Sequence, residues 1–146
     1  MVEAWPKPQD IRDFDEFPLH KALGLTLIDA RPGSAKCVLT TSRVTLGGVG
    51  GSVHGGLLAA MVDIAMLEAL APMAQPGEAF GGTADLNITY LRPALGERIY
   101  AEATVIRKGK TLAVTEVVIT DEQGRLCAKG RTISIIATEI LIPLKR

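Results

Sequence analysis

GGVGGSVHGGLLAAMVDIAMLEALA, residues 47–71, is the segment from which the architecture of this chain can be worked out. Its second part, residues 57–71, is rich in Ala, Leu and Met and has few β-branched residues, which predicts a helix that stops at Pro72. This helix is apolar nearly all round, and such a helix is buried on most of its sides. The glycine-rich first part, residues 47–56, predicts a loop that leads into the helix.

Alternating polar and apolar residues, typical of half-buried strands, flank this helix on both sides. In the segment 34–46, for example, Ala35, Cys37 and Leu39 all point to one face. The predicted strands cover residues 26–31, 34–46, 81–91, 97–107, 111–120 and 125–137, and a short helical turn at 17–25 ends near Gly24.

Short turns between the last strands favour an antiparallel meander. One helix cannot cover both faces of a six-stranded sheet, but it fills the concave face if the sheet curls around it. We therefore expect an α+β fold in which a curved antiparallel β-sheet wraps around one long central helix. Residues 17–146 are expected to form this single domain, and residues 1–16, with Pro6 and Pro8, an N-terminal arm.

The composition is that of a globular protein of ordinary size. The 146 residues fit one domain, and 16 basic residues balance 16 acidic ones at a pI near 6.7. A nucleic-acid-binding surface needs a basic excess, and only 4% of the residues are aromatic. Nucleic acid is therefore not an expected partner.

Several features bear on location and cofactors. The acidic, proline-containing N-terminus does not resemble a signal peptide, and the apolar stretch 57–66 is far short of the roughly 20 residues that cross a bilayer. Cys37 and Cys127 are interpreted as buried thiols of a reducing compartment. We expect a cytoplasmic protein without a membrane partner. The two cysteines, His20 and His54 lack the spacing of metal ligands, so neither a metal nor a bound cofactor is expected.

Asp63 lies in the middle of the apolar helix. A carboxylate that loses its hydration there becomes more basic, because burial disfavours the charged form. The alternative is an aspartate on a helix face that meets solvent or an arginine. Buried aspartate is rare without a reason, so Asp63 is a candidate for chemistry.

His54, Gly55 and Gly56 open the helix. The first backbone N–H groups of a helix lack intrahelical partners and carry the positive end of its dipole. Glycine also lets a ligand approach the backbone closely. The Gly55 N–H is therefore suited to stabilise the negative charge that develops on an ester or thioester carbonyl.

Gly55 and Asp63 are too far apart to act together within one chain. Their separation in sequence corresponds to roughly 12 Å along a helix, so one reacting carbonyl cannot touch both. If both serve one reaction, a second copy of the helix lies antiparallel beside the first. The spacing thus predicts a two-fold homodimer with two composite sites.

Three stretches resemble the hotdog-fold acyl-CoA thioesterases of the PaaI-like, thioesterase-superfamily branch. They are VHGGLLAAMVDIA at 53–65, TADLNITYLRPA at 83–94 and RKGKTLAVTEVVITDEQGRLCAKGRT at 107–132. The resemblance extends over about residues 17–137. It implies a hotdog fold and a homodimer, often a dimer of dimers. It also implies hydrolysis of a small-to-medium acyl-CoA thioester, with coenzyme A arriving as part of the substrate.

The resemblance also implies roles for individual residues. Asp63 falls on the catalytic carboxylate, which acts as a general base on water or as a nucleophile, and Gly55 falls on the amide that polarises the thioester carbonyl. His54 falls on the histidine that shapes the loop near the carbonyl, and Thr83 on a residue that helps to orient the water. Basic turn residues can pair with the phosphates of coenzyme A. Together with glycines of the loop, the expected substrate contacts are Gly48, Gly56, Arg92, Lys108, Gly109 and Lys110.

Gly48 departs from the family, which often has an asparagine six residues before the motif histidine. This departure keeps a non-catalytic acyl-CoA-binding protein open as an alternative. A hotdog dehydratase or hydratase is a weaker alternative, since residues 17–20 match its pattern only loosely. His20 is expected at the surface, although its turn is placed to cover an acyl pocket, and Phe80 and Tyr90 are expected in the core or an interface.

Overall fold

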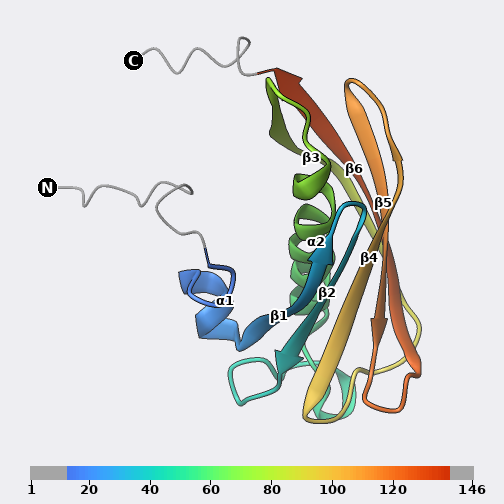
Figure 1. Ribbon diagram of the computed structural model, residues 1–146. Coiled ribbons are helices and arrows are strands. Elements are labelled where there is room, and N and C mark those ends of the chain that lie inside the picture. The colour runs from blue at the N-terminus through green and yellow to red at the C-terminus, as the bar shows by residue number, and fades with distance from the viewer. Residues whose placement is uncertain (1–12, 139–146) are drawn as a thin grey trace, which may run out of the picture.

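A computed structural model describes residues 13–138 of the chain. It confirms the predicted order of two strands, one long helix and four strands in an α+β fold (Figure 1). Residues 1–12, most of the predicted N-terminal arm, lie outside the described residues. The helices are α1 (Pro18–Leu23) and α2 (Gly55–Leu70), with 3₁₀ turns η2 (Val49–Gly51) and η3 (Ala71–Met73); the strands are β1 (Leu25–Arg31), β2 (Ser34–Thr40), β3 (Glu78–Tyr90), β4 (Arg98–Lys108), β5 (Leu112–Thr120) and β6 (Leu126–Thr138).

The six strands form one sheet in the order β1-β2-β4-β5-β6-β3, with every neighbouring pair antiparallel. The predicted meander is confirmed for β4, β5 and β6 and is wrong for β3, which pairs with β6 rather than β4. After β2 the chain passes along α2 to the far edge of the sheet, where β3 lies. The last three strands then fill the space between β2 and β3. Within residues 13–138, β3 therefore keeps one edge without a strand partner.

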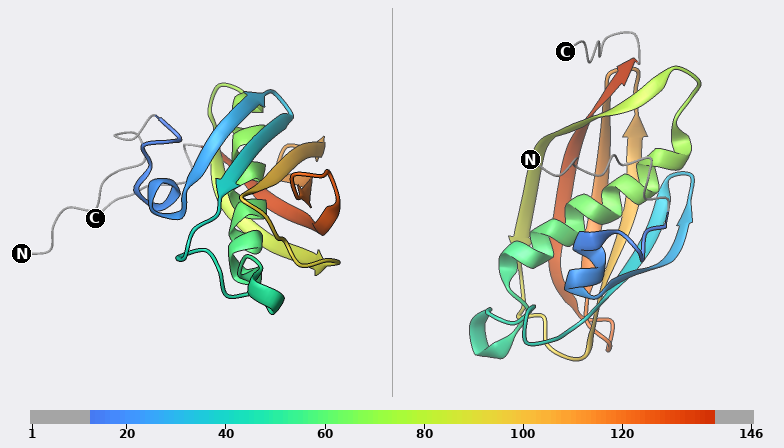
Figure 2. Two further views of the ribbon diagram at one scale, coloured as in Figure 1. Left: turned by 90° about the horizontal axis from the view of Figure 1, so that it is seen from below. Right: turned by 90° about the vertical axis from the view of Figure 1, so that its left-hand side faces the viewer.

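Helix α2 lies across one face of the sheet (Figure 2). It begins at Gly55 rather than Leu57, because the His54 side chain caps its first turn. It ends at Leu70, and Pro72 lies in the 3₁₀ turn that follows, as predicted. The side of the helix that faces the sheet is apolar and fully buried; it consists of Leu58, Met61, Val62, Ala65, Met66, Ala69 and Leu70.

The segment Gly55–Met73 has the length and apolar composition of a membrane span, with a mean hydropathy of 1.6. This segment is longer than the apolar stretch 57–66 noted in the sequence, because Asp63 and Glu68 do not interrupt the helix. In the structure the helix packs against all six strands of the sheet. That is the arrangement of a core helix.

Strand β2 ends at Thr40, so the predicted continuation of this strand to residue 46 is wrong. The Thr45 hydroxyl accepts from the Ser42 N–H at 2.9 Å and donates to the Ser42 carbonyl at 3.0 Å, which closes a turn. The His54 N–H then donates to the Thr45 carbonyl at 3.0 Å. This turn brings the glycine loop to the start of α2.

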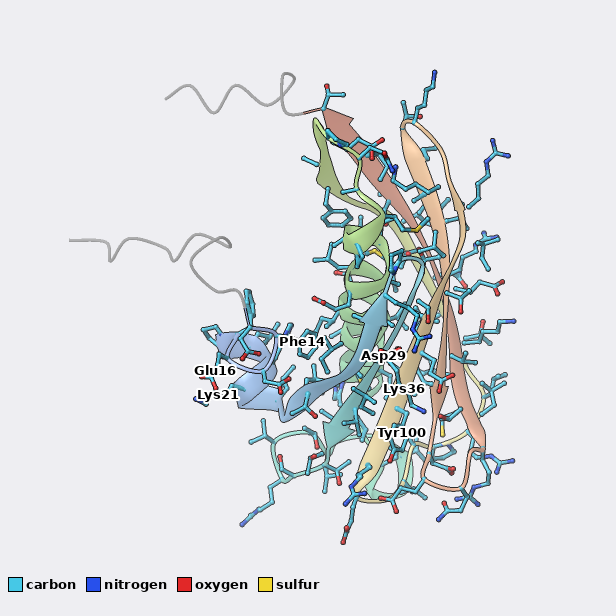
Figure 3. All side chains as sticks on the ribbon, in the orientation of Figure 1. Phe14, Glu16, Lys21, Asp29, Lys36 and Tyr100 are labelled. Atoms are coloured by element: carbon cyan, nitrogen blue, oxygen red, sulfur yellow. The ribbon has the colours of Figure 1, made fainter. Side chains whose placement is uncertain are left out.

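The segment before α1 packs against the domain. Phe14 lies between α1 and α2 and contacts the core (Figure 3). The Leu27 N–H donates to the Asp15 carboxylate at 2.9 Å. Helix α1 ends at Leu23 and is capped by Gly24, whose φ of 80° favours glycine, which agrees with the predicted end near Gly24. Residues 13–16 thus pack with the domain instead of extending from it as an arm.

Candidate active site

Asp63 and Thr83 meet between α2 and β3. The Thr83 hydroxyl donates a 2.7 Å hydrogen bond to Oδ1 of Asp63. The pairing of β3 with β6 shifts register on both sides of Thr83, and this bulge allows its side chain to face the helix. Oδ2 of Asp63 has no hydrogen-bond partner in the described part of the chain. One carboxylate oxygen is fixed, and the other is available to a substrate or a water.

Asp63 is only half-buried in the single protomer, which corrects the expectation that one chain removes its hydration. The sheet covers one side of α2, and Asp63 lies on the other. Ala60, Ile64 and Leu67 lie on the same uncovered side, at helical spacing, and are also half-buried. They form a continuous, mainly apolar stripe along the helix.

The N-terminus of α2 leaves one backbone donor without an acceptor. The N–H groups of Leu57 and Leu58 donate to the His54 carbonyl at 2.9 and 3.2 Å. The Gly56 N–H donates to Nδ1 of His54 at 2.9 Å, so it is not available to a substrate. Among residues 13–138, no group accepts a hydrogen bond from the Gly55 N–H. Gly55 is thus the donor of the first turn that a ligand can use.

The peptide group between Gly55 and Gly56 is held at both ends. Its N–H donates to His54, and its carbonyl accepts a 2.7 Å hydrogen bond from the Tyr90 hydroxyl. The Tyr90 ring lies so close to Gly55 that a Cβ added there would be 3.3 Å from two ring carbons. The sequence placed Tyr90 in the core or an interface and gave no sign of this contact, because it joins positions 35 residues apart; in the single protomer Tyr90 is exposed. Its place at the end of a strand, directly before the basic turn, is the signal that could have found it.

Gly48 sits where the loop has no space for a side chain. A Cβ at this position would lie 2.6 Å from the Val53 carbonyl oxygen and closer still to the Ser52 hydroxyl. The Gly48 N–H also donates to the Ser52 carbonyl at 2.9 Å. The loop is therefore closely packed around position 48, where the family often has an asparagine.

The structure separates the expected phosphate-binding residues into two groups. Arg92 is exposed and lines a pocket of about 460 Å³ together with Gly48, His54, Gly55 and Gly56. A phosphate-bearing ligand at the start of α2 would therefore come within reach of Arg92.

Lys108 ends β4, and Gly109 and Lys110 lie in the turn that follows, near the C-terminal end of α2. The Lys108 ammonium donates to the Glu78 carboxylate at 2.6 Å, and only 11% of its side chain is exposed. This hydrogen bond, with a second from the Gln75 N–H, holds the pKa of Glu78 below its usual range. The Gly109 N–H closes the turn onto the Leu112 carbonyl, while Lys110 is exposed. The ammonium group of Lys108 is therefore engaged in an ion pair with Glu78.

A second pocket, of about 430 Å³, lies beside Asp63 between α1, α2 and β3. His20 lines this pocket and is only 9% exposed, so its expected surface position is wrong. Phe80 also lines it, rather than packing in the core. The short helix α1 turns inward, which places His20 over the pocket that the sequence suggested it could cover.

Both cysteines are buried and unlinked, as predicted. Burial, with a contribution from the charge of Glu68, raises the pKa of the Cys37 thiol to about 12. Burial likewise raises the pKa of Cys127. Neither thiol is therefore suited to nucleophilic chemistry. Between residues 13 and 138, no group of three His, Cys, Asp or Glu residues is placed to hold a metal ion.

Known proteins resemble this chain in both sequence and fold. The family model of the thioesterase superfamily matches residues 50–128. Acyl-coenzyme A thioesterase 13 of Homo sapiens is 39% identical over 115 residues, covering 77% of this chain and 80% of the relative. The E. coli PaaI protein from the phenylacetic acid degradation operon superposes with a TM-score of 0.70 at 29% identity, over 80% of this chain and 86% of that one. A Bacillus halodurans protein solved with CoA gives a TM-score of 0.65 at 26% identity, over 70% of this chain and 66% of that one.

Proposed function

This chain belongs to the thioesterase superfamily and is a thioesterase of the hotdog fold, and we propose that it hydrolyses small-to-medium acyl-CoA thioesters to the free acid and coenzyme A. The observation that carries the proposal is the arrangement on α2. The unoccupied Gly55 N–H stands at its start, and the carboxylate of Asp63, bonded to Thr83, lies on its uncovered side. The human relative, named as an acyl-coenzyme A thioesterase, supports the choice of substrate.

Gly55 polarises the substrate. The thioester carbonyl oxygen accepts the Gly55 N–H, so the negative charge that develops on the oxygen is stabilised by the amide and the helix dipole. As a general base, Asp63 takes a proton from water while the water oxygen adds to the carbonyl carbon. The tetrahedral intermediate then collapses, the C–S bond breaks, and the proton passes to the departing thiolate.

Asp63 has a second route as a nucleophile. Its carboxylate oxygen bonds to the carbonyl carbon, the C–S bond breaks, and coenzyme A leaves as the thiolate. Water then hydrolyses the resulting anhydride, which releases the acid and restores the Asp63 carboxylate. In both routes the Thr83 hydroxyl keeps the carboxylate oriented.

A homodimer brings Asp63 of one protomer to Gly55 of the other. Three observations support it. The two groups lie roughly 12 Å apart along one helix. The open edge of β3 is a template for pairing with a second chain. The stripe of Ala60, Ile64 and Leu67 is only half-buried in one protomer, and a second protomer packed against it would also remove water from Asp63. We also propose that two dimers pair into a tetramer and that the protein is cytoplasmic.

Coenzyme A would approach along the loop before α2. Arg92 shares a pocket with Gly55 and is the basic residue placed to meet a phosphate there. Lys110 lies near the opposite end of α2. It comes close to Gly55 and Arg92 of the other protomer only if the two α2 helices run antiparallel. Lys108 keeps its ion pair with Glu78 and takes no phosphate.

The test is a mixed dimer of two inactive parents. D63N removes the carboxylate, and G55P removes the donor N–H. Proline suits the first helical position, and the extended His54 backbone, with ψ of 131°, suits a residue before proline. Because a Cβ at this position would lie 3.3 Å from the Tyr90 ring, G55A, which adds the Cβ and keeps the N–H, is the matched control. We expect each parent to lose turnover of acyl-CoA by at least about a hundredfold.

A mixed dimer, purified through two different tags, pairs Asp63 of the G55P chain with Gly55 of the D63N chain. It should recover about half of wild-type activity, because one of its two sites is intact. Mixed dimers as inactive as both parents would exclude the shared site. Full activity of D63N would exclude the role of Asp63. Circular dichroism of both parents checks that they fold.

A further inference from the structure

The pocket beside Asp63 has a polar end that the reaction above does not use. Its lining is mostly apolar and comes from the segment before α1, from α1, β1, α2 and β3. Apart from Asp63 and the exposed Asp13, its polar lining consists of His20 and Glu68.

Glu68 is half-buried and accepts no hydrogen bond from any residue in the described range 13–138. Burial raises the pKa of its carboxyl, and the nearby His20 partly lowers it. Its charge also adds to the effect of burial on the pKa of Cys37, a fully buried residue of β2. The carboxylate therefore lies near the interior and retains unused capacity to accept hydrogen bonds.

His20 is held rigidly over the same pocket. Its ring centroid lies 4.0 Å from that of Phe14 and 4.8 Å from that of Phe17. Nδ1 lies 2.9 Å from the Phe14 carbonyl oxygen. Because a carbonyl oxygen only accepts, Nδ1 carries a proton, and Nε2 is the ring nitrogen without a hydrogen-bond partner among residues 13–138. No hydrogen bond or ion pair joins His20 to Glu68 within the described chain, so the Glu68 carboxylate and Nε2 of His20 are both left to a ligand.

We propose that Glu68 and His20 recognise a hydroxyl group at the far end of the acyl chain, so that this thioesterase prefers ω-hydroxylated acyl groups to unsubstituted ones. The inference rests on the proposed function, which places the scissile carbonyl at Asp63. Glu68 follows Asp63 by five positions, roughly 7.5 Å along the helix axis, a span that suits an acyl chain of about six carbons. The apolar side chains of Ile64 and Leu67 line the path between them.

A hydroxyl fits this end of the pocket better than an ammonium group. An ammonium group only donates, whereas a hydroxyl both donates and accepts. A hydroxyl can therefore donate to the Glu68 carboxylate and also pair with Nε2 of His20 whether or not that nitrogen carries a hydrogen. An unsubstituted methyl group would instead leave both polar groups without a partner, which is how a site rejects the analogue that lacks a hydroxyl.

The first test compares kcat/KM for hexanoyl-CoA and 6-hydroxyhexanoyl-CoA. We expect the wild-type chain to favour the hydroxylated substrate by about tenfold or more. E68L should abolish that preference, and E68Q should keep part of it, because the amide oxygen still accepts. E97Q, at an exposed glutamate in the loop before β4, is the matched control and should leave the preference unchanged. An equal kcat/KM for both substrates, or a preference that survives in E68L, overturns the inference.

The second test separates this inference from the proposed function. The thioethers S-hexyl-CoA and S-(6-hydroxyhexyl)-CoA cannot be hydrolysed, so calorimetry compares their Kd whether or not turnover occurs. Tighter binding of the hydroxylated analogue to the wild type, lost in E68L, supports recognition by Glu68. Equal Kd values overturn it. A wild-type chain that shows this binding preference but hydrolyses neither thioester would overturn the proposed hydrolysis alone.

Discussion

The hydroxyl of Thr83 donates a 2.7 Å hydrogen bond to Oδ1 of Asp63 and so ties the middle of α2 to a bulge in β3. This contact joins the central helix to the strand with the open edge. It fixes the orientation of the carboxylate at the place where a second protomer would complete the site.

Removal of the Thr83 hydroxyl should lower activity without unfolding the protein. We expect T83A to reduce kcat/KM by about tenfold to a hundredfold, because hydrogen bonds to charged groups contribute about 1.5–3 kcal/mol. T83S should restore most of the rate, since serine keeps the donor. T89A, at an exposed position of the same strand, serves as the control in steady-state assays. Equal rates for T83A and T89A would contradict the role of Thr83.

Tyr90 should act as a positioning residue through the Gly55 carbonyl. Y90F removes a neutral hydrogen bond worth about 0.5–1.5 kcal/mol, so we expect kcat to fall by about threefold to tenfold with little change in KM. Y100F is the matched control, because Tyr100 lies in β4 and its ring contacts Lys36 (Figure 3). A rise in KM alone, with kcat preserved, would show that Tyr90 binds substrate instead of orienting the amide.

Restoration of the family asparagine at position 48 should harm this protein. A Cβ at Gly48 meets the Val53 carbonyl oxygen at 2.6 Å, so G48N should disturb the loop and lower both activity and melting temperature. G50N is the control, since nothing lies within 4 Å of a Cβ at Gly50 and asparagine tolerates its φ of 67°. A more active G48N would show that the loop adapts to the side chain.

The Glu78–Lys108 ion pair should make stability depend on pH. The hydrogen bond from Lys108 lowers the pKa of Glu78, so the ionised pair stabilises the folded state above the unfolded-state pKa of about 4.3 and is lost as the pH falls through the lower folded-state value. Melting temperatures of wild type and E78Q should therefore differ at pH 7 and converge as the pH falls below about 4. A difference that stays constant to pH 3 would contradict the pair.

Gly130 lets α2 approach β6 closely. A Cβ at this position would lie 2.7 Å from both methyl carbons of Val62, so G130A should cost about 1–3 kcal/mol through overpacking. The double variant G130A/V62A should be more stable than the sum of the two single changes, because the smaller side chain makes room. Denaturant unfolding of the four proteins measures this coupling, and strict additivity would exclude the contact.

Much of the fold could be predicted because its signals are local. The apolar, Ala- and Leu-rich run 57–71 indicates a buried helix wherever it packs, and alternation along β2 places Ala35, Cys37 and Leu39 on the inner face. The unpaired N–H at Gly55 follows from helix geometry, and the distance to Asp63 follows from the rise per residue. These features depend on spacing within one segment, so the sequence suffices for them.

Tertiary structure alone decided the rest, because those contacts join residues that are far apart in the chain. The position of β3 beside β6 depends on which strand arrives at which edge, and no local pattern specifies that. The same holds for the Tyr90 hydroxyl on Gly55 and for the meeting of His20 with Glu68 over one pocket. Periodicity predicts on which face of a helix or strand a side chain lies. Its hydrogen-bond partner depends on how the elements pack against each other.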